Sequence, residues 1–469
     1  MNLFGRRVIC TTTEDITQKN VVAELERALS VHAKNAQEED YLYWYRRGKQ
    51  PVRNRKKQIR PEINNKVTEN HAGEIVAFKN GYFLTQPAYY VGRRGGAQIG
   101  EKIERLNEYL YMSGKTMADN ALADWFHTVG VGILHVQPNA DEIAPVKVQV
   151  LDPRCAFVAY SPYPGHKPVM GVNIVSVCGA DGRLTKIYDV FTEKQVFRIV
   201  RGGAGANEVR DAQKNEIGRV PLVEYQYDAN RMGSFESVIT MLDAINETQS
   251  NRMDGIAQFI QSLMIFYNCQ LGDDESGNQI TPALIRESGA IFLKSIGQDK
   301  ADLKILSEQL NQTQTQVMID DMYEQAMAIA GVPVMKATKA STSDNVGAVY
   351  LRSGWGTADT LARNTEDLFK ESNRLFDEIF LGILRVKTDL DLNLSDIELK
   401  FTRNEMNNML VKTQAALNLK SLGLSPEIVL GRSGVSNDPV GDVAKSQPYI
   451  DAAFGTQEAS SDRGEAEQI

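Results

Sequence analysis

The sequence predicts an α+β protein with several domains, and three observations support this class. The chain has 469 residues, which corresponds to roughly two to four domains of ordinary size. Short β-branched runs separated by Gly, Pro and Asp turns fill residues 130–227. Stretches with apolar residues three and four apart lie on both sides of this region. Apolar residues at 42% and charged residues at 24% fit a globular chain and exclude a disordered or collagen-like one.

Acidic residues exceed basic ones, with 60 Asp and Glu against 52 Lys and Arg, so the net charge is −8. A protein that binds nucleic acid tightly is normally basic, because neutralising phosphates supplies most non-specific affinity. Any DNA contact must therefore be local, or of a kind that needs no tight binding. The four cysteines form no CxxC pair and the five histidines lack metal-ligand spacing, which predicts reduced thiols, no metal site and no cofactor. The sequence also has no apolar signal region and no long apolar run, so we expect no secretion signal and no membrane span.

Residues Gly114-Lys115-Thr116 imitate the end of a phosphate-binding loop, but Tyr109 occupies the position where that motif needs a Gly. The segment also has a helix–turn–helix pattern without a preceding buried strand, which favours a structural role. No GxSxG, HExxH or EF-hand pattern occurs. The sequence therefore predicts no catalytic residue and no enzyme activity, and a nucleotide-dependent enzyme is kept only as an alternative.

The N-terminal part is predicted to be helical. Apolar residues recur at helical spacing within residues 17–45, and residues 66–80 and 99–129 show further helical patterns. Between the first two helices, residues 46–60 form a basic block with eight positive side chains and no negative one. The rest of the chain then carries 44 positive against 60 negative residues, a net charge of −16.

The part after the β-rich region is predicted to alternate between helices and short inserts. A helix at 234–264 has Ser234 as its N-cap. The insert at 265–311 is predicted to contain a strand from Leu263 to Leu271, a polar turn from Gly272 to Gly277, a helix at 282–287 and a strand from Ala290 to Leu293. The later elements are a helix at 312–330 that ends at Gly331-Val332-Pro333, a polar loop at 334–345, a helix at 346–387 kinked at Ser353-Gly354-Trp355-Gly356, a strand at 396–402, helices at 405–422 and 426–432, and a disordered acidic tail from about residue 455.

Four carboxylates align on one face of the helix at 234–264: Glu236, Asp243, Glu247 and Asp254. At about 100° per residue, their spacing places them within roughly 40° of one line along the helix. The opposite face carries apolar residues at three- and four-residue steps. A solvated face of an amphipathic helix is the simpler interpretation. The functional interpretation is a wall that repels phosphate, past which a polyanion slides without binding.

The order of these elements, together with several short motifs, resembles the portal proteins of tailed double-stranded DNA bacteriophages over about residues 40–450. The match is to the siphophage-type portal architecture, in which a long helix, a small insert and a returning helix follow one another. The motifs are, in chain order, Tyr45-Arg46-Arg47-Gly48, Asn64-Asn65-Lys66 with Asn70, Gly81-Tyr82 with Pro87, Leu151-Asp152-Pro153, Gly331-Val332-Pro333 and Asn345-Val346-Gly347-Ala348.

The resemblance implies a multidomain portal fold with long stem helices, a small α/β clip insert, a β-containing wing and a helical crown. The implied parts are a wing at 1–233, a stem helix at 234–264, a clip at 265–311, a returning stem helix at 312–331, a tunnel loop at 332–345, a long kinked helix with a wing strand at 346–403, a crown at 404–454 and a tail at 455–469. It also implies a ring, usually of twelve subunits, at one capsid vertex of the virion, assembled in the host cytoplasm. The implied partners are viral double-stranded DNA in the channel, the terminase large subunit, the major capsid and scaffolding proteins and a head-completion or adaptor protein, without a membrane.

In such a ring, Glu236, Asp243, Glu247 and Asp254 would line the channel with negative charge. The tunnel loop would contact DNA through two lysines set among small polar residues, although ordinary solvated lysines are an equally good interpretation. The loop residues concerned are Lys336, Thr338, Lys339, Ser341, Thr342 and Ser343.

The basic block 46–60 has three possible uses: a solvated face, ion pairs with a neighbouring subunit, or a contact for packaged DNA or scaffolding protein. We favour ion pairs between subunits, because the rest of the chain is acidic. Another type of capsid or tail structural protein is the main alternative to a portal. The long helix–insert–helix hairpin argues against it, because a shell subunit has no need of a stem.

Overall fold

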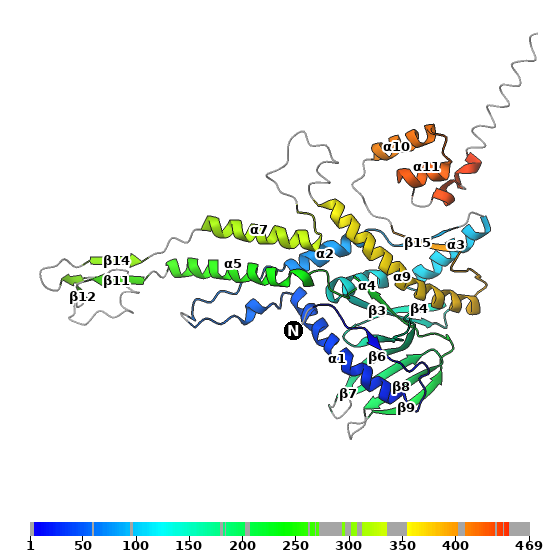
Figure 1. Ribbon diagram of the computed structural model, residues 1–469, viewed down its shortest axis with the longest axis horizontal. Coiled ribbons are helices and arrows are strands. Elements are labelled where there is room, and N and C mark those ends of the chain that lie inside the picture. The colour runs from blue at the N-terminus through cyan, green and yellow to red at the C-terminus, as the bar shows by residue number, and fades with distance from the viewer. Residues whose placement is uncertain are drawn as a thin grey trace, which may run out of the picture. The chain divides into compact units, whose positions relative to one another are not determined.

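The computed structural model is described for most of the chain. The described residues are 4–58, 61–93, 97–178, 182, 184–201, 207–260, 263–267, 269–271, 293–295, 302–306, 312–334, 354–401, 409–436, 439–443 and 445–449. They form two compact units (Figure 1). The first unit consists of Met1–Gly48, Asn70–Ile239 and Met327–Ile469, and the second consists of Lys49–Glu69 and Thr240–Ala326.

The N-terminal helices and the long helix after Gly354, which helical periodicity predicted, belong to the first unit. The helices are α1 (Val21–Arg46), α2 (His71–Phe83), α3 (Ala97–Met112), α4 (Lys115–Val129) and α9 (Trp355–Lys387). The helical pattern at 99–129 is divided into α3 and α4, which confirms the helix–turn–helix pattern predicted at Gly114; this residue has a φ of +79°, a left-handed conformation that breaks the hydrogen-bond ladder. Phe83, Phe126, Phe369 and Phe376 are fully buried and join α2, α4 and α9 into a single core.

The β-rich region is confirmed, and it forms two sheets. A six-stranded sheet has the order β1-β5-β6-β7-β8-β9, and a three-stranded sheet has the order β10-β3-β4. The strands of the first are β1 (Ile9–Cys10), β5 (Ala156–Tyr160), β6 (Pro168–Cys178), β7 (Leu184–Thr192), β8 (Gln195–Arg201) and β9 (Asn207–Lys214). Those of the second are β3 (Val131–Pro138), β4 (Val146–Leu151) and β10 (Leu222–Gln226). All these pairs are antiparallel except β1 with β5, which brings the N-terminal segment beside the larger sheet.

One strand and two helices predicted near the C-terminus are confirmed in place. The strand expected at 396–402 is β15 (Ile397–Lys400), which pairs antiparallel with β2 (Tyr89–Gly92), about 300 residues earlier in the chain. The two helices expected after it are α10 (Met409–Ser421) and α11 (Pro426–Ser433). Ser425 takes the N-cap position of α11 with extended backbone, as Pro426 at the first helical position indicates.

The long helix predicted at 346–387 begins at Trp355 in the described part of the chain, and residues 346–353 lie outside it. Gly354 is the N-cap of α9 and has a φ of +81°, a left-handed conformation that glycine adopts readily. The predicted kink at 353–356 stays a prediction, because the residues before Gly354 lie outside the described ranges.

The second unit contains α5 (Ile239–Ile260), most of α7 (Gln312–Ala330) and the short helix η1 (Pro51–Asn54). A single helical turn, η2 (Glu236–Val238), precedes α5. The predicted N-cap Ser234 is wrong, because its buried hydroxyl has no hydrogen-bond partner among the described residues. Residues 49–69, which lie within the predicted wing at 1–233, belong to this second compact unit, and the predicted limits of the wing stay a prediction.

The insert between α5 and α7 is described only in its strands. β11 (Leu263–Tyr267) pairs antiparallel with β14 (Asp302–Leu306), and β12 (Cys269–Leu271) pairs antiparallel with β13 (Leu293–Ser295). The first predicted strand is thus divided between two ladders, and β14 was not predicted. The predicted turn at 272–277 and helix at 282–287 lie outside the described residues, as does the tail from 450 onward.

Candidate functional site

Glu236, the first of the four aligned carboxylates, is buried inside the first unit. Its side chain pairs with Arg6, and both side chains are at most 1% exposed. It also accepts hydrogen bonds from the backbone N–H groups of Gly233 (2.8 Å) and Gly5 (3.3 Å). Burial raises the pKa of Glu236, and the charge of Arg6 and the two backbone N–H groups oppose that rise. The prediction that Glu236 lies on an exposed face is wrong, because the N-terminal segment covers it.

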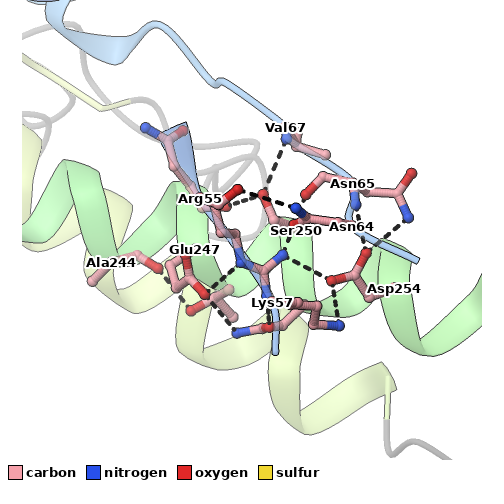
Figure 2. Close-up of polar contacts among 12 residues, drawn as sticks. Arg55, Lys57, Asn64, Asn65, Val67, Ala244, Glu247, Ser250 and Asp254 are labelled. Carbon is pink, nitrogen blue, oxygen red and sulfur yellow. Dashed lines mark hydrogen bonds and ion pairs between the residues drawn. The ribbon is translucent and has the colours of Figure 1, made fainter. Parts of the chain in front are cut away.

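Asp254, the last of the four, is also buried, and it is the centre of a polar cluster (Figure 2). Its carboxylate accepts hydrogen bonds from Arg55 (2.8 Å) and Lys57 (2.7 Å). The same carboxylate accepts two more from the backbone N–H (2.7 Å) and the side-chain amide (2.9 Å) of Asn65. Burial alone would raise the pKa of Asp254, but the hydrogen bonds from Lys57, Asn65 and Arg55 outweigh it, and the pKa is lowered. The prediction of an exposed Asp254 is therefore also wrong.

The two middle carboxylates reach the surface to different degrees. The side chain of Glu247 is 50% exposed and pairs with the Nε atom of Arg55 at 2.9 Å. Asp243 is partly buried. Glu236 lies in the turn η2 before α5, whereas the other three carboxylates lie on α5 itself, and of the four only Asp243 and Glu247 are accessible from outside this chain.

An extended segment of the basic region runs along α5 and is fixed to it at regular intervals. Its backbone N–H groups at every second residue donate to α5 side chains at every fourth residue. The pairs are Asn65 with Asp254 (2.7 Å), Val67 with Ser250 (3.0 Å) and Glu69 with Asn246 (2.7 Å). Two extended residues advance about 6.5 Å and four helical residues advance about 6 Å, so the two spacings match. We call this set of three bonds the α5 ladder.

The basic block supplies partners to the acidic face of its own chain. Arg55 bridges Glu247 and Asp254, and Lys57 contacts Asp254 and the backbone oxygen of Ile63 (3.3 Å). Arg46 pairs with Asp124 in the first unit. Arg46, Arg55 and Lys57, for which ion pairs between subunits were predicted, thus find acidic partners within their own chain.

Sequence reasoning missed the α5 ladder and the three ion pairs that Arg55 and Lys57 form beside it. A signal was present, since Asn246, Ser250 and Asp254 place short polar side chains at four-residue steps. Such side chains satisfy backbone N–H groups that approach from outside the helix. The sequence alone does not say that a segment about 190 residues earlier supplies those groups.

The phosphate-binding interpretation of Gly114-Lys115-Thr116 is not supported by the position of the lysine. Lys115 is buried, forms an ion pair with Asp119 and lies 4.6 Å from the ring centre of Phe376. Burial raises the pKa of Asp119, and the charge and hydrogen bond of Lys115 oppose that rise. A lysine held this way is not available to a phosphate, so the structural interpretation of this motif is the better one.

The predicted tunnel-loop residues Lys336, Thr338, Lys339, Ser341, Thr342 and Ser343 lie outside the described residues. The start of the loop is described. α7 is followed by Gly331 with a φ of +67°, and the N–H of Val332 donates to the backbone oxygen of Met327 at 2.8 Å. The buried Nζ of Lys79 donates to the Gly331 oxygen at 3.4 Å, and burial lowers the pKa of Lys79 to about 8.

Within the described ranges, no group of His, Cys, Asp and Glu could hold a metal ion, and no helix has the length and apolar character of a membrane span. The described chain thus contains a helix and a returning helix with a β-paired insert between them, and a first unit of several helices with a six-stranded, a three-stranded and a two-stranded sheet. The chain matches the family model "Phage portal protein, SPP1 Gp6-like" over residues 27–447. It therefore belongs to this family of phage portal proteins.

Two solved structures are similar to the chain. One is from the neck of an empty GTA particle computed with C6 symmetry, with 14% identity over 77% of this chain and 89% of that one and a TM-score of 0.41. The other is from the virion of a native gene transfer agent particle, with 14% identity, the same coverage and a TM-score of 0.36. No curated protein matches the chain.

Proposed function

We propose that twelve copies of this portal protein form a ring at one vertex of a phage capsid, through which DNA is packaged and later ejected. The observation that carries the proposal is family membership over residues 27–447. The ring would be part of the virion and would assemble in the host cytoplasm with capsid and scaffolding proteins. Negative-stain microscopy of the purified protein tests this directly, since a ring with a central hole is expected and a monomer or a sheet would contradict it.

Asp243 and Glu247 are the residues of α5 that we assign to the channel wall. Both are accessible, unlike Glu236 and Asp254, and a carboxylate repeated once per subunit would repel phosphate along the axis. The double variant Asp243→Asn with Glu247→Gln should form rings and package DNA more slowly, because the wall loses its repulsion. A matched control is Asp367→Asn on α9, an exposed residue outside α5. Packaging by the double variant at the control's rate would refute the assignment.

The tunnel loop would contact DNA weakly through Lys336 and Lys339. Lysine–phosphate contacts are salt-sensitive, and small neighbouring side chains would let loops from several subunits crowd around the duplex. Replacing both lysines by Ala should leave stability nearly unchanged, because exposed charges contribute little, and should reduce DNA retention. Normal packaging and retention across a range of salt would mean that these lysines are ordinary surface residues.

The insert at 265–311 would be the docking surface for the terminase large subunit and later for the head-completion or adaptor protein. Its place between two long helices supports this, because such a module is presented away from the helices' own packing surfaces. The ring should survive changes to the insert that abolish partner binding.

A further inference from the structure

The two partners of α5 lie on opposite sides of that helix. Ser250, in the middle of the α5 ladder, contacts the extended segment, whereas Arg252 donates a hydrogen bond to Gln316 of α7. At about 100° per residue, Arg252 is about 200° from Ser250 around the helix. Figure 1 accordingly shows α5 between the blue segment 49–69 and α7. The second unit therefore has two different outer flanks.

The flank formed by α7 is acidic and partly apolar. Ile319 and Ala326 are buried, and the opposite side of the helix exposes Val317 (63%), Met318 (49%) and Asp321. α7 has three acidic residues and no basic one. Among the residues the structure describes, Asp321 has no ion-pair partner. A stripe of two large apolar side chains beside such a carboxylate is typical of a surface that another molecule covers.

The flank formed by the segment 49–69 is basic. Arg55 and Lys57 form ion pairs with Asp254 of α5, whereas Arg53 and Lys56 are exposed to solvent. Neither Arg53 nor Lys56 has an ion-pair partner within the described part of its own chain. Among the described residues of segment 49–69, Arg53 and Lys56 are thus two basic side chains that the ion pairs with α5 leave available.

We propose that the acidic flank of one copy, Val317, Met318 and Asp321, docks on the basic flank of the next copy, Arg53 and Lys56. The inference rests on the proposed ring. Two complementary flanks on opposite sides of one helix are what a head-to-tail interface between identical subunits requires, and such an interface closes into a ring. The aliphatic parts of Arg53 and Lys56 cover the exposed Val317 and Met318, while their charges meet Asp321.

Charge reversal tests the pairing. Asp321→Lys should raise the protein concentration at which half of the chains are in rings by about fivefold, measured by mass photometry, because each interface exchanges an attraction for a repulsion. Arg53→Glu with Lys56→Glu should have a similar effect, and the triple variant should return to within about twofold of the wild type. Asp367→Lys makes the same change of charge on α9 and should have no effect. If the wild type forms rings but the triple variant does not recover ring formation, the proposed contact is wrong and the proposed function stands. If the wild type itself stays monomeric, both the contact and the proposed function are wrong.

Cross-linking tests the contact without relying on charge. In a chain whose four cysteines are replaced by Ser, Met318→Cys with Lys56→Cys should give a ladder of covalent oligomers with a short bismaleimide. The control pair Met318→Cys with Met117→Cys uses a residue that is 76% exposed in the first unit and should give monomers. Equal ladders from both pairs, or rings without a ladder from the first pair, would overturn the proposed contact.

Discussion

Removing the carboxylate of Asp254 should open the α5 ladder. In Asp254→Ala, Arg55 loses a partner while its side chain is only 9% exposed, Lys57 loses its only ion pair among the described residues, and the backbone N–H of Asn65 loses its acceptor. Breaking a buried ion pair by removing one partner costs about 3–5 kcal/mol. Because Lys57 can turn toward solvent and Arg55 keeps Glu247, we expect the lower end, about 3 kcal/mol.

Amide hydrogen exchange in the second unit measures this loss locally. A cost of about 3 kcal/mol corresponds to roughly a hundredfold faster exchange at Asn65, Val67 and Glu69. Glu247→Ala is the matched control, since it removes an exposed carboxylate from the same Arg55 and should cost under about 1 kcal/mol. Acceleration below about tenfold in Asp254→Ala, or equal acceleration in both variants, would refute the reasoning.

The same contact predicts a pH dependence with a definite sign. The pKa of Asp254 is lowered in the folded protein, so its stabilisation is complete above the unfolded value of about 3.9 and is lost as pH falls through the lower folded pKa. The difference in exchange between the wild type and Asp254→Asn should therefore be constant at neutral pH and shrink only below about pH 4. A difference that disappears near pH 6 would mean that another group titrates.

Three further changes have defined outcomes. Gly331→Ala should lower the free energy of unfolding by about 2 kcal/mol, because Gly331 has a φ of +67° and an added Cβ would collide with the side chain of Leu361. A chemical unfolding curve like that of the wild type would contradict this prediction. Lys115→Ala should lower the free energy of unfolding by about 3 kcal/mol, because it leaves the carboxylate of Asp119 buried and unpaired. The double variant Lys115→Met with Asp119→Leu should recover most of this loss. If the wild type bound ATP in calorimetry and Lys115→Ala did not, the nucleotide-binding alternative would be supported instead. Deleting residues 272–277 should preserve the ring and weaken terminase binding in a pull-down, and unchanged binding would remove this turn from the docking surface.

The sequence predicted local structure better than it predicted partners. Helical periodicity located the helix that carries Asp243, Glu247 and Asp254, and β-branched runs located the sheets. Glycine marked the boundary at Gly354, but the sequence did not show that its left-handed backbone would begin α9. Periodicity says which residues share a face, and it does not say what covers that face. Glu236 and Asp254 were therefore assigned to solvent, although Arg6 and Arg55, about 200 residues away, neutralise them.

The division of the chain also affects how portal proteins of this kind exchange parts by recombination. The second unit is not one continuous cassette, because residues 49–69 belong to it together with 240–326. A crossover that replaced only α5, the insert and α7 would pack α5 of one parent against residues 49–69 of the other. The α5 ladder would then form only if positions 246, 250 and 254 still carried side chains that accept hydrogen bonds, as Asn246, Ser250 and Asp254 do. We expect viable chimaeras to inherit both stretches from one parent, or to leave these three positions unchanged. An isolated helical hairpin cut at residue 240 would likewise need residues 49–69 supplied with it.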